Sequence, residues 1–151
     1  MQLNQRWMLA ALIVSGLLLA ACSGTSARTP KAGPATIEQI DGTDLSRVTL
    51  TAEATERLGI QTAPVSEVEV ARAGGEPALR KVIPYAAVMY RSNGDTYVYT
   101  NLEPLVFVRA PISVDYIEGD QAVLADGPPT GTAVVTAGAP ELYGTEFKVG
   151  K

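Results

Sequence analysis

The chain has 151 residues, of which 46% are hydrophobic and 19% are charged, so it can bury the core of one domain but hardly of two. It contains no histidine and one cysteine, which excludes a Ser-His-Asp triad, a disulfide framework and a Cys-pair zinc site. The formal net charge of −4 means that the chain lacks the excess of positive charge typical of proteins that bind nucleic acid. We therefore expect a protein that is not an enzyme, carries no cofactor and binds no nucleic acid.

The N-terminus has the pattern of a bacterial export signal. Residues 1–6 are polar with one cation, and residues 7–21 are apolar apart from Ser15 and Gly16. A helix over this apolar run spans about 22 Å, which is short of the ~30 Å hydrocarbon core of a bilayer. We therefore predict that residues 1–21 are a secretory signal peptide and not a permanent membrane span.

The segment Leu19-Ala20-Ala21-Cys22 resembles the bacterial lipobox, in which the cysteine is lipidated and becomes the first mature residue. The alternative is an ordinary free thiol, but the sole cysteine directly follows the motif, which favours lipidation of Cys22. Two or three acyl chains anchor a protein stably, whereas one chain anchors it only marginally. We expect a lipoprotein of the bacterial cell envelope that faces the periplasm. Ser23 after the cysteine indicates export toward the outer membrane, but this sorting rule differs between bacterial groups and leaves inner and outer membrane open.

The residues after the lipobox have the composition of a linker. Residues 23–36 are small and polar, contain proline and glycine, and offer no large apolar side chain to a core. We predict that residues 22–36 are a lipidated, flexible tether and that residues 37–151 form one domain. The mature chain keeps 11 basic and 16 acidic side chains, so we expect this domain not to bind an anionic bilayer through charge.

One stretch of the domain has a helical pattern, and the rest favours short strands. Residues 49–60 contain Thr51 as a potential N-cap, and Ala54 and Leu58 share one helix face. A second helical turn is predicted over residues 140–143. Alternating residues, Asn-Gly and other turns predict about seven strands, and hence an all-β roll, barrel or sandwich with one short helix. The candidate strand segments are residues 67–71, 81–84, 87–90, 96–100, 105–109, 112–117, 121–125 and 132–136.

Several acidic residues could support chemistry, but each has a simpler interpretation. Asp115, Glu118 and Asp120 could form a calcium site, yet their spacing is not that of an EF-hand loop and fits an exposed hairpin turn. The pairs Glu53/Glu56 and Glu67/Glu69 could act as acid–base carboxylates. We expect them instead on a solvated helix start and on the outer face of a strand. The sequence therefore predicts no metal ligand and no catalytic residue.

The hairpin around Asn93-Gly94 is the strongest candidate for a contact surface. Tyr97 and Tyr99 alternate on one strand and therefore point the same way, with Tyr90 across the hairpin. Aromatic side chains often anchor interfaces, although in strands they more often fill a half-buried sheet face. We predict a partner contact made by Tyr90, Tyr97 and Tyr99, with Arg91 and Arg109 at its rim.

Most of the domain resembles a known family. The motifs are residues 48–65 (VTLTAEATERLGIQTAPV), 82–90 (VIPYAAVMY), 93–99 (NGDTYVY), 124–139 (LADGPPTGTAVVTAGA) and 141–144 (ELYG). They are similar to the two ends of HlyD-like periplasmic adaptors, the membrane fusion proteins of RND efflux pumps. The resemblance implies a β-roll of the membrane-proximal type, a binding function and no catalytic residue.

The chain departs from this family in its middle. A complete adaptor of this kind carries an α-helical hairpin, a lipoyl domain and a β-barrel between its two ends, whereas here residues 73–77 (AGGEP) join the ends directly. The resemblance therefore implies a module that docks on an RND transporter or on a full-length adaptor but cannot bridge the periplasm alone. The alternative is a stand-alone periplasmic lipoprotein that binds a small ligand or a metal ion.

Overall fold

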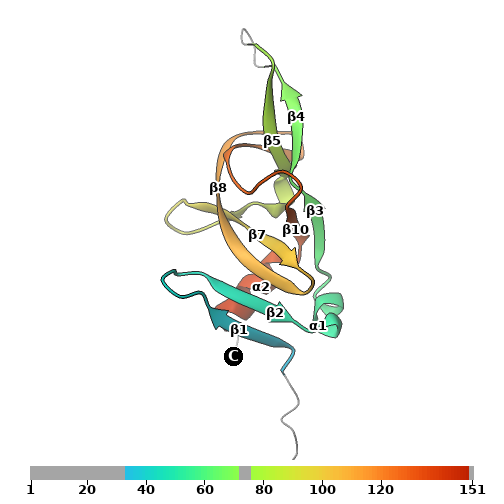
Figure 1. Ribbon diagram of the computed structural model, residues 1–151, viewed down its shortest axis with the longest axis vertical. Helices are drawn as coiled ribbons and strands as arrows, with labels where there is room; N and C mark the ends of the chain where they lie inside the picture. The colour runs from blue at the N-terminus through green and yellow to red at the C-terminus, as the bar shows by residue number, and fades with distance from the viewer. Residues whose placement is uncertain (1–32, 72–75, 150–151) are drawn as a thin grey trace, which may run out of the picture. The chain divides into compact units, whose positions relative to one another are not determined.

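The structure is a computed structural model that describes residues 33–71 and 76–149 (Figure 1). The predicted signal peptide, Cys22 and most of the predicted tether lie outside the described residues. Strands account for 53% and helices for 15% of the described part, which confirms the predicted all-β class. The elements are β1 (Ala35–Gln39), β2 (Ser46–Leu50), α1 (Ala52–Arg57), β3 (Gln61–Pro64), β4 (Ser66–Val70), β5 (Ala78–Pro84), η1 (Tyr85–Ala87), β6 (Met89–Tyr90), β7 (Thr96–Glu103), β8 (Val106–Glu118), β9 (Gln121–Asp126), β10 (Ala133–Ala137) and α2 (Ala139–Glu146).

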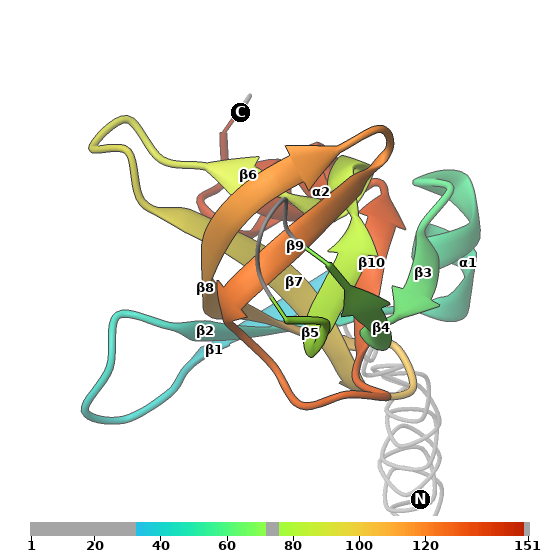
Figure 2. The same cartoon turned by 90° about the horizontal axis from the view of Figure 1, so that it is seen from above.

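Within the described residues the strands form one antiparallel sheet. Its main path runs β3-β10-β7-β8-β9-β5-β4; β2 pairs with β8, β1 pairs with β2, and β6 pairs with β7. Strand β8 is the long, curved strand in Figures 1 and 2, and it serves both halves of the sheet. Its residues 106–112 pair with β7, and its residues 113–118 pair with β9. The predicted strands 105–109 and 112–117 are therefore one bent strand.

The bend in β8 has a local cause. Pro111 has no N–H to donate to a ladder, and the pairing with β9 shifts register between Ser113 and Tyr116. Such irregularities increase the local twist and let one strand leave one sheet half for the other. As a result β7, β8 and β10 lie between two groups of packed side chains.

The two groups form two hydrophobic cores on opposite faces of these central strands. On β7, Tyr97 and Tyr99 pack in the first core and Val98 packs in the second. On β10, Val135 joins the first core and Val134 joins the second. Because successive side chains of a strand point to opposite faces, a strand buried on both sides becomes apolar at nearly every position. Helix α2 and β2 complete the first core, and β5 and β9 complete the second.

Helix α1 confirms the predicted cap but is shorter than the predicted stretch. The Thr51 side chain accepts a hydrogen bond from the Ala54 N–H at 3.1 Å. Ala54 is buried, and Leu58 packs against the first core, so the two share the inner face as predicted. The helix cannot begin at residue 49 because Leu50 is the last residue of β2.

Other boundaries differ from the predictions. Strand β1 begins at Ala35, inside the predicted tether, and the sequence patterns do not predict β1, β2 or β3. On β4, whose outer face was predicted to carry Glu67 and Glu69, Val68 is also 36% exposed because β4 is an edge strand that pairs only with β5. Helix α2 extends to Glu146, beyond the helical turn predicted over residues 140–143.

Glycine at position 138 is required by both conformation and space. Gly138 precedes α2 with φ +83°, in the left-handed region that L side chains avoid. A Cβ at this position would overlap Cδ1 of Ile60 and lie 3.2 Å from the Leu58 carbonyl oxygen. Gly131 also has a left-handed φ, +87°, but a Cβ at this position would meet no atom within 4 Å. A substitution at Gly131 therefore measures the conformational cost alone.

We predict that Gly138→Ala destabilises the domain more than Gly131→Ala does. Gly131→Ala should lower the free energy of unfolding by about 1–2 kcal/mol, the cost of a left-handed alanine. Gly138→Ala should lower it by about 1–3 kcal/mol more, because α2 must also move away from Ile60. Urea unfolding monitored by circular dichroism measures both values, and equal losses would contradict the close packing of α2.

Candidate functional site

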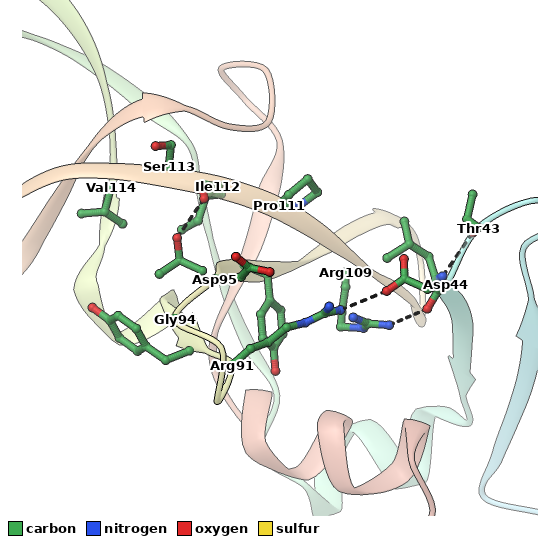
Figure 3. A pocket seen from close by; sticks show the side chains of 14 residues that line it. Thr43, Asp44, Arg91, Gly94, Asp95, Arg109, Pro111, Ile112, Ser113 and Val114 are labelled. Carbon is green, nitrogen blue, oxygen red and sulfur yellow. Dashed lines mark hydrogen bonds and ion pairs between the residues drawn. The ribbon is translucent and has the colours of Figure 1, made fainter.

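An open pocket of about 760 Å³ lies between the β1–β2 turn, the β6–β7 hairpin and the middle of β8 (Figure 3). We call it the arginine pocket, because Arg91 and Arg109 line it together with Asp44 and Tyr97. Arg91 comes from the hairpin, Arg109 from β8, and Asp44 from the turn between β1 and β2. The fold thus brings together side chains that are far apart in the sequence.

Arg109 is a buried cation at the floor of the pocket, with 2% of its side chain exposed. Its Nε donates to both carboxylate oxygens of Glu146, at 2.9 and 3.0 Å. Its Nη2 donates to the carbonyl oxygen of Asp44 at 2.8 Å. Its Nη1 is buried and has no hydrogen-bond partner among the described residues. The guanidinium group therefore still has one buried nitrogen that could donate to a ligand.

Glu146 of α2 connects this cation to the first core. The Tyr99 hydroxyl donates to Glu146 Oε2 at 2.6 Å, so both carboxylate oxygens act as acceptors. Burial raises the pKa of Glu146 above its ordinary value, and the hydrogen bond from Tyr99 opposes that shift. Burial and the neighbouring Glu146 raise the pKa of Tyr99, so the hydroxyl keeps its proton and remains a donor. Tyr99 and Arg109 are also direct partners across β7 and β8.

Arg91 is more weakly held. Its Nη2 lies 3.4 Å from Asp44 Oδ2, and 35% of the Arg91 side chain and 75% of the Asp44 side chain are exposed. The guanidinium carbons of Arg91 and Arg109 lie 5.7 and 5.8 Å from the centroid of the Tyr97 ring. These distances are within the range of cation–π attraction. Figure 3 shows both guanidinium groups directed at Asp44.

The predicted contact residues gather here, although not as an exposed surface. Tyr90, Arg91, Tyr97 and Arg109 line the pocket, and Tyr99 lies behind it in the first core. The prediction that Tyr97 and Tyr99 form an exposed face is wrong, because they are only 4% and 0% exposed. Their strand is central in the sheet, and α2 contributes to the core that covers that face.

Arg109 was predicted at the rim of the contact, and this is also wrong, since it is 3% exposed. Its position opposite Tyr99 places it on the same covered face. Tyr90, which is 55% exposed, and the partly exposed Arg91 do lie at the surface. A partner contact at these two residues stays a prediction.

Sequence reasoning missed two residues of the site, Glu146 and Asp44. Glu146 shares one helical face with Ala139 and Leu142, and this spacing could have marked it as inward-facing had the helix been extended past residue 143. Asp44 lies in an irregular turn and contributes its backbone carbonyl to Arg109. No local pattern could have indicated that contact.

The other acidic candidates lie elsewhere. Across residues 33–71 and 76–149, no cluster of three or more histidine, cysteine or acidic side chains is placed to hold a metal ion. Asp115 lies on β8, and Glu118 and Asp120 lie at the β8–β9 turn. Glu53 forms an exposed ion pair of 2.6 Å with Arg57 of the same helix. Glu56, Glu67 and Glu69 are exposed on α1 and β4.

In the part of the chain that the structure describes, no helix is long and apolar enough to cross a membrane. Comparisons of the chain with models of known protein families, with curated proteins and with solved structures found no match.

Proposed function

We propose that this chain is a lipid-anchored binding module of the bacterial envelope that docks on an RND transporter or on a full-length periplasmic adaptor. Its lipid on Cys22 would hold it at the membrane, with the domain facing the periplasm. It would act by binding alone, without a cofactor. The proposal rests on the resemblance to the ends of HlyD-like adaptors and on how the fold combines the matching segments.

One observation carries the proposal: strands from the two adaptor-like segments pair with each other. Strand β3 lies within the adaptor-like residues 48–65 and pairs with β10, which lies within the adaptor-like residues 124–139. Strands β4 and β5 pair antiparallel, from Ser66 opposite Val82 to Val70 opposite Ala78. The upper part of Figure 1 shows these two strands side by side. This arrangement is what a module made by joining the two ends of an adaptor requires.

The surface that best suits docking is the tip of the β6–β7 hairpin. Tyr90 and the neighbouring Tyr85 are 55% and 41% exposed, and a hydrogen bond with Tyr85 raises the pKa of Tyr90. Arg91 follows directly and is partly exposed. Exposed tyrosine next to arginine is the composition typical of residues that dominate binding energy at interfaces.

A metal-binding alternative gains no support from the described residues, because no suitable cluster of ligands lies among them. A small-ligand alternative does gain support. The arginine pocket is within the usual size of small-molecule sites, and the buried Nη1 of Arg109 is without a partner there. Tyr90 and Arg91 belong to both surfaces, because these two residues of the docking surface also line the pocket.

The anchoring part of the proposal predicts that Cys22→Ser abolishes lipid attachment. Cys22 is the only thiol in the chain and follows Leu19-Ala20-Ala21, so no other cysteine can replace it. Metabolic labelling with a fatty-acid analogue should mark the wild type and not the variant, which should also leave the membrane fraction. Equal labelling of both proteins would contradict the lipoprotein assignment.

The docking part predicts that Tyr90→Ala weakens recovery of a transporter or adaptor component. Loss of an anchoring aromatic typically costs about 2 kcal/mol or more, roughly thirtyfold in affinity. Leu102→Ala is the matched control, because Leu102 is 69% exposed near the opposite end of β7. Crosslinking in membranes followed by co-purification should show a loss for Tyr90→Ala only.

Thermal unfolding of both variants verifies that each is folded before recovery is compared. Identical partners in identical yield from wild type and Tyr90→Ala would exclude the hairpin as the docking surface. Recovery of no transporter or adaptor component, even with the wild type, would contradict the docking function itself and favour the small-ligand alternative.

A further inference from the structure

We infer that the arginine pocket binds a small monocarboxylate with an apolar body. This inference deepens the small-ligand function and rests on it, whereas docking through the hairpin does not depend on it. Three features carry it: a buried donor without a partner, a weak internal carboxylate contact that a ligand can replace, and walls that are partly apolar.

The buried donor is Nη1 of Arg109. A buried N–H without a hydrogen bond costs free energy, and more so when it belongs to a charged group. The other two guanidinium nitrogens are engaged by Glu146 and by the Asp44 carbonyl, which fixes the plane of the group. Arg109 therefore presents Nη1 in a preset direction, and a carboxylate oxygen is the strongest acceptor for it.

The weak internal contact is the pair between Arg91 and Asp44. At 3.4 Å and with 75% of the Asp44 side chain exposed, this contact contributes little to stability. A carboxylate from a ligand can replace that of Asp44 on Arg91 without breaking a buried interaction. A ligand carboxylate held by Arg91 in place of Asp44 would lie in the same pocket that Arg109 lines.

The walls of the pocket indicate the chemistry of the part of the ligand beyond its carboxylate. Tyr97, Pro111, Ile112 and Val114 provide apolar surface beside the arginines. Two carboxylates, those of Asp44 and Asp95, also line the pocket, and Glu146 already pairs with Arg109. Two guanidinium groups thus face three carboxylates, so the site has no surplus of positive charge, which disfavours a phosphate dianion more than a monoanion. A ligand with an apolar body and a single carboxylate therefore suits the walls and is repelled less than a dianion.

The probe is radiolabelled hexanoate, in equilibrium dialysis against the full chain in lipid nanodiscs, with binding to empty nanodiscs subtracted. Labelled 1-hexanol has the same apolar body without the charge, and inorganic phosphate has charge without the body. We expect saturable binding of hexanoate that is at least about tenfold tighter than that of either control, because only hexanoate satisfies both arginines and walls.

Three variants locate the binding. Arg91→Gln should weaken hexanoate binding about tenfold, since it removes a charged donor from the exposed side of the pocket. Asp44→Asn should strengthen it several-fold, because the competing carboxylate is gone. Arg47→Gln is the matched control and should change nothing, because Arg47 pairs with Glu103 and does not line the pocket.

The outcomes distinguish carboxylate recognition from the existence of a small-ligand site. Equal binding of hexanoate and hexanol, tighter binding of phosphate, or unchanged binding in Arg91→Gln would overturn carboxylate recognition while leaving a small-ligand site in place. No saturable binding of any probe would overturn both. None of these results bears on docking, which the co-purification of Tyr90→Ala tests separately.

Discussion

The buried ion pair between Arg109 and Glu146 is the interaction on which the rest of the site depends. It links β8 to α2, and through Arg109 Nη2 and the Tyr99 hydroxyl it also holds the β1–β2 turn and β7. Taking two charges out of water is costly, and the cost is offset only where hydrogen bonds satisfy both groups. Here both oxygens of Glu146 are satisfied, and only Nη1 of Arg109 is not.

This ion pair affects both the first core and the arginine pocket. By fixing α2 on the sheet, it keeps the first core closed over Tyr97 and Tyr99. It also fixes Arg109 at the floor of the arginine pocket. A buried ion pair is weak evidence for extra stability, because apolar side chains of similar size often do as well. Its structural effect here is to hold the Arg109 guanidinium group in one orientation.

Local features of the fold were predictable from the sequence, whereas contacts between distant segments were not. The Thr51 cap and the Asn93-Gly94 hairpin depend on a few neighbouring residues, and both were predicted. Alternation on β7 showed that Tyr97 and Tyr99 share a face, but it could not show that α2 helps to cover that face. The partners of Arg109 come from two elements far away in the sequence, so its burial had no local signal.

The candidate site was predictable in part for the same reason. Four residues of the predicted contact line one pocket because they belong to neighbouring strands and one hairpin, which local patterns can place. The predicted exposure of Tyr97 and Arg109 was wrong, because side chains from distant elements cover them. Asp44, which lines the pocket, and Glu146, which holds Arg109, come from such remote elements.

A double-mutant cycle on Arg109 and Glu146 tests the central claim most directly. Arg109→Met, Glu146→Met and the double variant would be compared by urea unfolding. Each single change leaves a buried charge without its partner and should lower the free energy of unfolding by about 3–5 kcal/mol. The double change removes both charges, so its loss should be far smaller than the sum of the single losses. Single losses that add to within about 0.5 kcal/mol would show that the two side chains act independently and would contradict the account.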